Sequence, residues 1–178
     1  SVFDAVAHSF TTVSTGGFST YDDSIAYFDS LTIEVVACVF MVLGSLSFMI
    51  HGRALAQRGL EPYKHDVEVR AFLTIIAVAS AFVMLVLHTT TANSWVTSAR
   101  LAIFQVITVI SSTGFAISDF SVWPLMLPPL IIFIGFIGGC SGSTAGGMKV
   151  IRIVILARQT GIEIARLIHP HMLRSLKI

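Results

Sequence analysis

Long apolar runs alternate with short polar segments along this chain. Residues 31–50 form a run of twenty positions that only Glu34 interrupts, and residues 71–87 carry no charged side chain. Both runs approach the length that an α-helix needs to cross about 30 Å of hydrocarbon, so each predicts a transmembrane helix. A third apolar region, residues 123–157, is divided near its middle by a glycine-rich stretch and therefore predicts a broken helix.

The overall composition indicates a membrane protein. Apolar residues make up 54% of the 178 positions, charged residues make up 12%, and the mean hydropathy is +0.85. Soluble domains carry charge at about a quarter of their positions. The net charge of +1 also lacks the basic excess of a protein that binds nucleic acid, and the two distant cysteines exclude a disulfide scaffold.

The charged residues divide between the two sides that the predicted helices define. Ten of the eleven Lys and Arg residues lie between the first two apolar runs or after the glycine-rich stretch. Positively charged loops tend to face the cytoplasm, so these segments are predicted to be cytoplasmic and the opposite, acidic side external. The cytoplasmic cations are Arg53, Arg58, Lys64, Arg70, Lys149, Arg152, Arg158, Arg166, Arg174 and Lys177.

The two external segments, residues 1–30 and 88–122, resemble each other. Each predicts a short amphipathic helix followed by a glycine turn, and an offset of 97 residues superposes the two copies. The same offset places an apolar run after each copy, which supports an internal duplication. The identical pairs are Ala5 and Ala102, Thr11 and Thr108, Ser14 and Ser111, Gly17 and Gly114, Phe18 and Phe115, and Asp22 and Asp119.

Each external segment predicts a helix that enters the membrane part way, turns at a glycine and returns as extended chain. Non-helical backbone is tolerated at membrane depth only where it is buried in protein or lines a watery cavity, so its carbonyls are available to replace the water around a cation. Gly17 and Gly114 are expected to adopt positive φ, and Phe18 and Phe115 to brace the turns. We call residues 14–17 and 111–114 the filter turns. The candidate ligands are the carbonyl groups of Ser14, Thr15, Gly16, Gly17, Ser111, Ser112, Thr113 and Gly114.

The glycine-rich stretch predicts an unwound segment inside the membrane. Five of its ten residues are glycine, and each costs a helix about 1 kcal/mol relative to alanine. Small side chains allow such a segment to lie in a narrow cavity and to move, which favours a gate. Lys149 and Arg152 follow at the predicted inner mouth, where they either repel cations or anchor the chain to lipid headgroups. The stretch, here called the glycine-rich loop, consists of Gly138, Gly139, Cys140, Ser141, Gly142, Ser143, Thr144, Ala145, Gly146 and Gly147.

These motifs resemble the Trk/Ktr/HKT superfamily of potassium transporters, most of all its bacterial TrkH branch. The resemblance rests on residues 12–20 and 111–115 and above all on residues 136–152. It implies an all-α membrane protein built from helix–pore loop–helix repeats, with re-entrant filter loops and a broken transmembrane helix. Four such repeats surround one pore in this family, with one filter glycine each. Gly17 and Gly114 would then coordinate potassium, the only metal expected, through backbone carbonyls, and the glycine-rich loop would gate the pore beneath them.

The resemblance also implies how the chain is organised. Residues 1–50 would be the pore loop and second helix of repeat two, residues 51–70 a cytoplasmic linker, residues 71–158 the complete repeat three, and residues 159–178 a cytoplasmic amphipathic segment. Repeats one and four are missing from this arrangement, so the chain is expected to be a fragment. Two of four filter turns do not close a pore by themselves.

The resemblance further implies the surroundings of the protein. The expected location is the bacterial inner membrane, with the lipid bilayer and the remaining repeats of the same parent protein as neighbours. A second copy in a homodimer and a cytosolic nucleotide-binding regulatory subunit of the TrkA type are the expected partners. No cofactor and no nucleic acid are expected, and no arrangement of residues suggests an enzyme.

Two other interpretations compete with the pore. A secondary transporter with broken helices also unwinds its chain at mid-membrane, although inverted rather than parallel repeats would favour it. A phosphate-binding loop fails on spacing, because Met148 separates Gly147 from Lys149 and Val150 replaces the required Ser or Thr. Glu34, near the interface, is expected to reach water or a partner on another helix.

Overall fold

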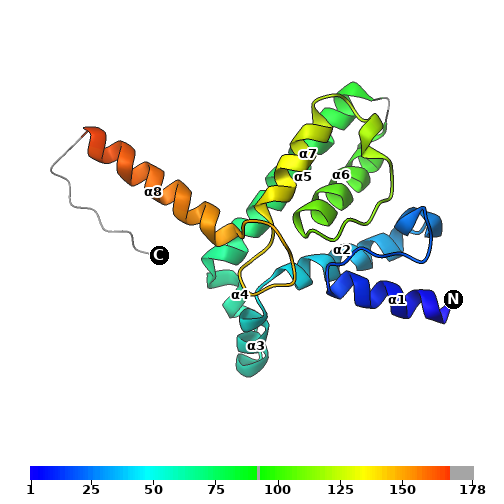
Figure 1. The fold of residues 1–178 in the computed structure, drawn as a ribbon, viewed down its shortest axis with the longest axis horizontal. Helices are drawn as coiled ribbons and strands as arrows, with labels where there is room; N and C mark the ends of the chain where they lie inside the picture. Colours follow the sequence, from blue (N-terminus) through cyan, green and yellow to red (C-terminus); the bar gives the residue numbers. More distant parts are fainter. Residues whose placement is uncertain (92, 169–178) are drawn as a thin grey trace.

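The computed structural model describes residues 1–91 and 93–168, and all regular secondary structure among them is helical (Figure 1). This confirms the predicted all-α fold. The elements are α1 (Val2–Val13), η1 (Ser24–Phe28), α2 (Leu31–Ser45), α3 (Phe48–Gln57), α4 (Glu61–His65), α5 (Val67–Thr90), α6 (Trp95–Ile110), η2 (Phe120–Val122), α7 (Leu127–Ile137) and α8 (Val150–Ile168).

Helix α5 contains the apolar run predicted at residues 71–87. Its 24 residues correspond to about 36 Å, which exceeds the thickness of the hydrocarbon layer. The helix begins at a capping side chain, because Asp66 Oδ1 accepts hydrogen bonds from the N–H groups of Glu68 and Val69 at 2.9 and 3.0 Å. Among the described residues, α5 is the one helix long and apolar enough to cross a membrane by itself.

The continuous helix predicted at residues 31–50 is wrong at its C-terminal end. Helix α2 stops at Ser45, and α3 continues from it at an angle of 97°. The last carbonyls of α2 accept hydrogen bonds from the glycine-rich loop: Cys140 N–H donates to Ser45 at 2.8 Å and Thr144 N–H to Gly44 at 3.2 Å. The apolar run itself does not indicate that these carbonyls bind N–H groups about a hundred residues later in the sequence. The predicted linker, residues 51–70, is itself mostly helical.

The predicted break in the third apolar region is present. Helix α7 ends at Ile137, α8 starts at Val150, and the glycine-rich loop lies between them. Helix α8 then passes through the predicted boundary at residue 158 without interruption and leaves the helical body near α4 (Figure 1). The C-terminal part of the predicted amphipathic segment, residues 169–178, lies outside the described residues.

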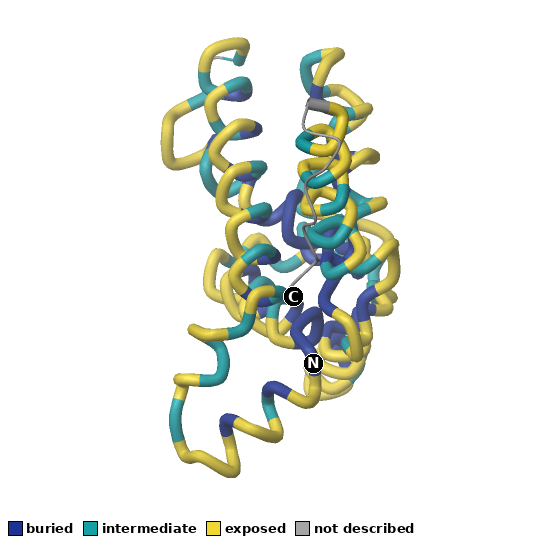
Figure 2. The backbone as a smooth tube through the Cα atoms, turned by 90° about the vertical axis from the view of Figure 1, so that its left-hand side faces the viewer, coloured by how far each residue is buried: buried dark blue, intermediate teal, exposed yellow. Residues whose placement is uncertain are grey.

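The core lies around α6, which packs against α5, α7 and α2. Figure 2 shows the buried positions gathered inside the bundle, with exposed positions along its outer surface. Large apolar side chains nevertheless remain exposed on α2 and α7, including Val35, Val39 and Phe133. This distribution suits helices that face lipid or further helices rather than water.

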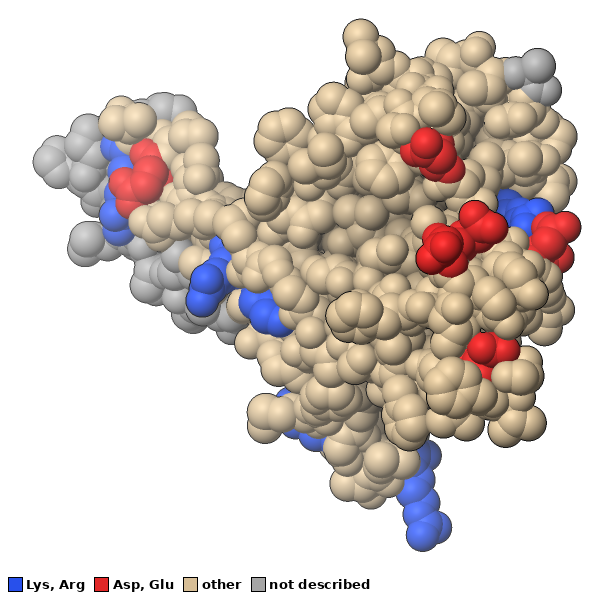
Figure 3. Space-filling view, turned by 45° about the vertical axis from the view of Figure 1, so that its right-hand side comes forward, with Lys and Arg blue, Asp and Glu red and all other residues tan. Residues whose placement is uncertain are grey.

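The charged side chains separate as the sequence predicted. In Figure 3, most Asp and Glu side chains lie over the right-hand half of the molecule, whereas Lys and Arg lie mainly toward its lower and left-hand edges. Ser121 N–H donates to Asp119 at 2.8 Å, and this hydrogen bonding lowers the pKa of the Asp119 carboxyl. The carboxylate therefore stays ionised on the side predicted to be external.

Candidate functional site

The filter turns end α1 and α6 with the same hydrogen bonds. The N–H groups of Ser14 and Ser111 each donate to the carbonyl four residues earlier, at 3.0 Å in both copies. Two residues later, the N–H groups of Gly16 and Thr113 reach back five residues, at 2.8 and 3.0 Å. These bonds satisfy carbonyls that a helix end would otherwise leave without donors. The offset of 97 residues found in the sequence therefore also superposes the backbone.

Positive φ angles alternate in the same way in both turns. Gly17 and Gly114 have φ of 69° and 84°, as expected of glycine at these turns. Thr15 and Ser112 also have positive φ, 52° and 58°, which the sequence did not predict. This conformation costs a non-glycine residue about 1–2 kcal/mol, so the surrounding structure has to maintain it in both copies.

The two filter turns touch through their backbones. A Cβ atom built on Gly17 would lie 1.7 Å from the carbonyl oxygen of Thr113, far inside any tolerated contact. Because the neighbouring atom belongs to the backbone, a side-chain movement could not relieve such a clash. The fold thus brings together the two sets of candidate ligands, which are 97 residues apart in the sequence.

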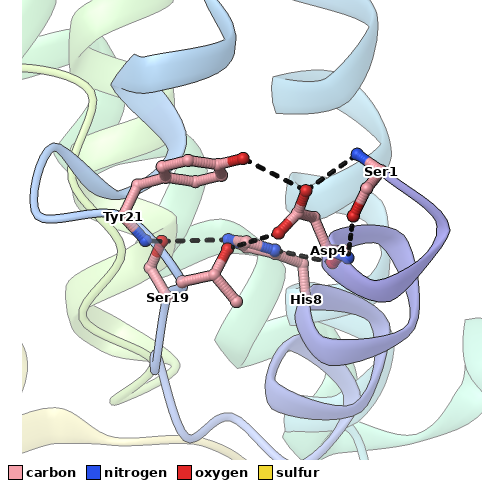
Figure 4. A network of polar contacts seen from close by, with 6 residues as sticks. Ser1, Asp4, His8, Ser19 and Tyr21 are labelled. Carbon is pink, nitrogen blue, oxygen red and sulfur yellow. Dashed lines mark hydrogen bonds and ion pairs between the residues drawn. The ribbon is translucent and has the colours of Figure 1, made fainter.

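Polar side chains hold the return segment of the first turn against α1 (Figure 4). His8 Nδ1 lies 2.7 Å from the backbone oxygen of Asp4, and His8 Nε2 lies 3.0 Å from Ser19 Oγ. A carbonyl only accepts, so His8 Nδ1 is the donor of the bond to Asp4. The Asp4 carboxylate accepts from Tyr21 at 3.1 Å, and Thr11 Oγ1 donates to the carbonyl of Phe18 at 2.9 Å.

Apolar packing replaces these polar contacts at the second turn. Phe115 is 1% exposed, whereas its counterpart Phe18 is 77% exposed. Phe115 thus packs against its turn as predicted, whereas Phe18 lies exposed among the described residues and its bracing role stays a prediction. Gln105 and Thr108 occupy the positions of His8 and Thr11, yet Gln105 Oε1 and Thr108 Oγ1 are buried without a hydrogen-bond partner among the described residues.

The glycine-rich loop has two ends that meet. A Cβ atom on Gly138 would lie 2.1 Å from the carbonyl oxygen of Gly146, and one on Gly147 would lie 2.6 Å from the Cα of Gly138. Both Gly138 and Gly147 have positive φ, 71° and 79°. The N–H of Met148 closes the neck by donating to the carbonyl of Phe136 at 3.0 Å. Glycine is required at this neck by both the close approach and the backbone conformation.

The glycine-rich loop also contacts the end of α1 and the second filter turn. Thr144 Oγ1 lies 3.2 Å from the carbonyl oxygen of Val13, the last residue of α1, and 3.0 Å from that of Gly44 on α2. A Cβ atom on Gly146 would lie 3.2 Å from Ser112 Oγ in the second turn. One segment of small residues therefore lies against the residue that precedes the first filter turn and against the second filter turn itself.

The two predicted inner-mouth cations differ in their surroundings. Lys149 Nζ donates a hydrogen bond to the carbonyl of Ala145, so its ammonium group is directed back to the glycine-rich loop. Arg152 is exposed in the first turn of α8.

Two carboxylates make contacts that the sequence did not predict. Glu34, 3% exposed, pairs with Arg100 through hydrogen bonds of 2.7 and 2.5 Å and so joins α2 to α6. A helix partner was one of the expected alternatives for Glu34, but its identity was not predicted. Glu68 Oε1 accepts from the N–H of Ser141 in the glycine-rich loop at 2.6 Å and from the N–H of Ile151 in α8 at 3.2 Å. Glu68 was missed because its position in the predicted linker carries no motif.

Comparison with known proteins gives consistent results over the whole chain. The family model TrkH, described as a cation transport protein, matches residues 1–178. The Trk system potassium uptake protein TrkH of Halomonas elongata is 43% identical over 176 residues, which cover 99% of this chain and 36% of that protein. The protein of the same name from Escherichia coli K12 is 40% identical over 178 residues, which cover 99% of this chain and 37% of that protein.

A solved structure agrees with these relatives. The crystal structure of the potassium transporter TrkH from Vibrio parahaemolyticus matches with a TM-score of 0.96 at 40% sequence identity, covering 100% of this chain and 39% of that one. The chain thus spans a little over a third of the length of the relatives it matches. The likeness confirms the prediction of an all-α membrane protein.

Proposed function

This chain belongs to the TrkH family of cation transport proteins, and from that premise we propose that it contributes two of the turns that line a potassium pathway through a bacterial inner membrane. Potassium is the substrate in this proposal, held by backbone carbonyls of the filter turns without a cofactor. The glycine-rich loop is the gate. The names of the relatives, which describe potassium uptake, support the choice of ion.

The matched backbone of the two filter turns carries the proposal. Thr15 and Gly17 share their positive φ angles with Ser112 and Gly114, and the turns meet where Gly17 lies against Thr113. Ligands of this kind are neutral dipoles, which stabilise a partly dehydrated cation while still allowing it to leave. Repeats that run in the same direction also favour a pore over an ion-coupled transporter built from inverted repeats.

The proposal extends to the partners of the full-length protein. The remaining repeats would supply the missing filter turns, and a second copy would form a homodimer. A TrkA-like nucleotide-binding subunit would dock on the cytoplasmic side, where the exposed cations of α3 and α8 lie. The relatives belong to a Trk system, which supports a multi-component transporter.

The proposal is tested by Gly114→Ser in the full-length protein reconstituted into liposomes. Gly114 has φ of 84° and open space around its Cβ position, so serine alters the turn through backbone strain rather than through a clash. We expect the potassium-to-sodium flux ratio to fall at least severalfold. Gly52→Ser on α3, where an added Cβ also meets no atom within 4 Å but φ is not positive, is the matched control.

An unchanged flux ratio in Gly114→Ser, with the protein folded, would remove the filter assignment. An equal loss in Gly52→Ser would show that the assay reports general damage to the protein.

A further inference from the structure

Glu68 joins three parts of the molecule through one oxygen atom. The residue lies in the first turn of α5, and its Oε1 accepts from Ser141 N–H in the glycine-rich loop at 2.6 Å and from Ile151 N–H in α8 at 3.2 Å. Both donors need such an acceptor. Ile151 N–H belongs to the start of a helix, where N–H groups lack an intrahelical carbonyl, and Ser141 N–H belongs to an irregular loop.

The ionised form of Glu68 suits this position. Hydrogen bonds to a charged acceptor are roughly twice as strong as those between neutral groups. The positive end of the α8 dipole, next to Ile151, also favours a negative charge there. Lys149, two residues before Ile151, donates to the carbonyl of Ala145, while Glu68 Oε1 accepts from the two N–H groups.

On its other side, the glycine-rich loop is held by backbone hydrogen bonds to α2 and by the hydroxyl of Thr144. The N–H groups of Cys140 and Thr144 donate to the last carbonyls of α2. The contact with Glu68 differs from these because its acceptor is a carboxylate oxygen that also binds an N–H group of α8. A displacement of α8 therefore acts on the same oxygen atom that holds Ser141.

We propose that Glu68 is a positioning residue that holds the glycine-rich loop in its closed position and couples that position to α8. The inference rests on the proposed function of the loop as a gate. Opening then requires Ser141 N–H to leave Glu68, and a partner that pulls on α8 weakens the contact from the other side.

The test replaces Glu68 in the full-length protein and measures two quantities. Glu68→Ala is expected to raise the ratio of open to closed channels about tenfold in single-channel recordings, which corresponds to about 1.4 kcal/mol. Glu68→Gln retains an acceptor oxygen without the charge, so a rise of about threefold is expected. The potassium-to-sodium selectivity is expected to stay unchanged in both, because Glu68 contacts neither filter turn.

The second quantity is amide hydrogen exchange, which reports the loop directly. Peptides covering residues 138–147 are expected to exchange faster in Glu68→Ala, whereas peptides from α6 should not change. Glu61→Ala is the matched control, since Glu61 is also a cytoplasmic-side carboxylate but pairs only with the exposed Lys64 and His65 among the described residues.

The possible outcomes distinguish a failure of the role of Glu68 from a failure of the glycine-rich loop as the gate. Unchanged exchange in the loop would overturn the role of Glu68. Faster exchange with unchanged channel opening would instead refute the loop as the gate. Lower flux together with altered selectivity would overturn the inference in favour of Glu68 as an ion ligand. If Glu68→Ala does not fold, Glu68→Gln carries the same tests with the smaller expected effects.

Discussion

The turn after α1 and the turn after α6 have the same hydrogen bonds and the same pattern of positive φ angles, while the residues around them differ in kind. His8, Thr11 and Asp4 bind the return segment of the first turn through hydrogen bonds. The second turn is packed around the buried ring of Phe115.

This difference shows that the two turns share their backbone conformation but not the side chains that support it. The shared part is backbone: a helix end, a residue forced to positive φ and a glycine two positions later. The supporting side chains differ because each turn faces different neighbours. Ala26 N–H and Ser24 Oγ, for example, form hydrogen bonds to Ala116 of the second return segment, at 3.1 and 3.2 Å.

The largest expected effect comes from adding one methyl group to each turn glycine. Gly17→Ala places a Cβ 1.7 Å from the Thr113 carbonyl, so we expect potassium flux to be lost or the protein not to fold. Gly114→Ala meets no atom within 4 Å and incurs only the strain of positive φ, about 1–2 kcal/mol. Flux in liposomes and monodispersity in size-exclusion chromatography measure the pair. Equal behaviour of the two variants would contradict the backbone contact between the turns.

A smaller effect is expected from removing the two phenylalanines. Phe115→Ala deletes a fully buried ring and should lower the free energy of unfolding by about 3–5 kcal/mol. Phe18→Ala removes an exposed ring and should change it by less than about 0.5 kcal/mol. Thermal unfolding of the detergent-solubilised chain tests both. A large loss of unfolding free energy in Phe18→Ala would contradict the exposure of this ring, because it would show that the ring is buried in the protein under the assay conditions.

The smallest expected effect, and the most direct test of polar against apolar support, replaces the paired threonines with valine. Thr11→Val loses the hydrogen bond to Phe18 and should destabilise the protein by about 0.5–1.5 kcal/mol. Thr108→Val removes a buried hydroxyl that has no partner among the described residues, so it should be neutral or slightly stabilising. The expected result is a lower unfolding midpoint in Thr11→Val and an unchanged or higher midpoint in Thr108→Val. Equal destabilisation would mean that Thr108 has a hydrogen-bond partner in solution.

The sequence predicted the features that depend on neighbouring positions. The helical fold follows from apolar runs, the repeat from matching residues at an offset of 97, and the break between α7 and α8 from glycine content; the structure contains all three. The positive φ of Gly17 and Gly114 was predictable for the same local reason. Whether the filter turns bind potassium remains a prediction.

The features that the sequence did not predict depend on distant partners. Helix α2 ends early because the N–H groups of Cys140 and Thr144 bind its last carbonyls. Glu34 pairs with Arg100, which lies 66 positions later in the sequence. Glu68 holds Ser141 across 73 positions. A hydrophobicity pattern carries no record of such pairs, so the bend and the two carboxylate contacts became visible only in three dimensions.

The closed neck of the glycine-rich loop has a consequence for sequence variation among relatives. Because Gly147 lies against Gly138, the residues between them form a loop whose two ends are in contact. Insertions or deletions at its tip leave the register of α7 and α8 untouched, and the entropy of closing a slightly longer loop rises only slowly with length. A change in tip length would therefore act on the contacts of Ser141 and Thr144 with Glu68 and α2, and not on the ends of α7 and α8.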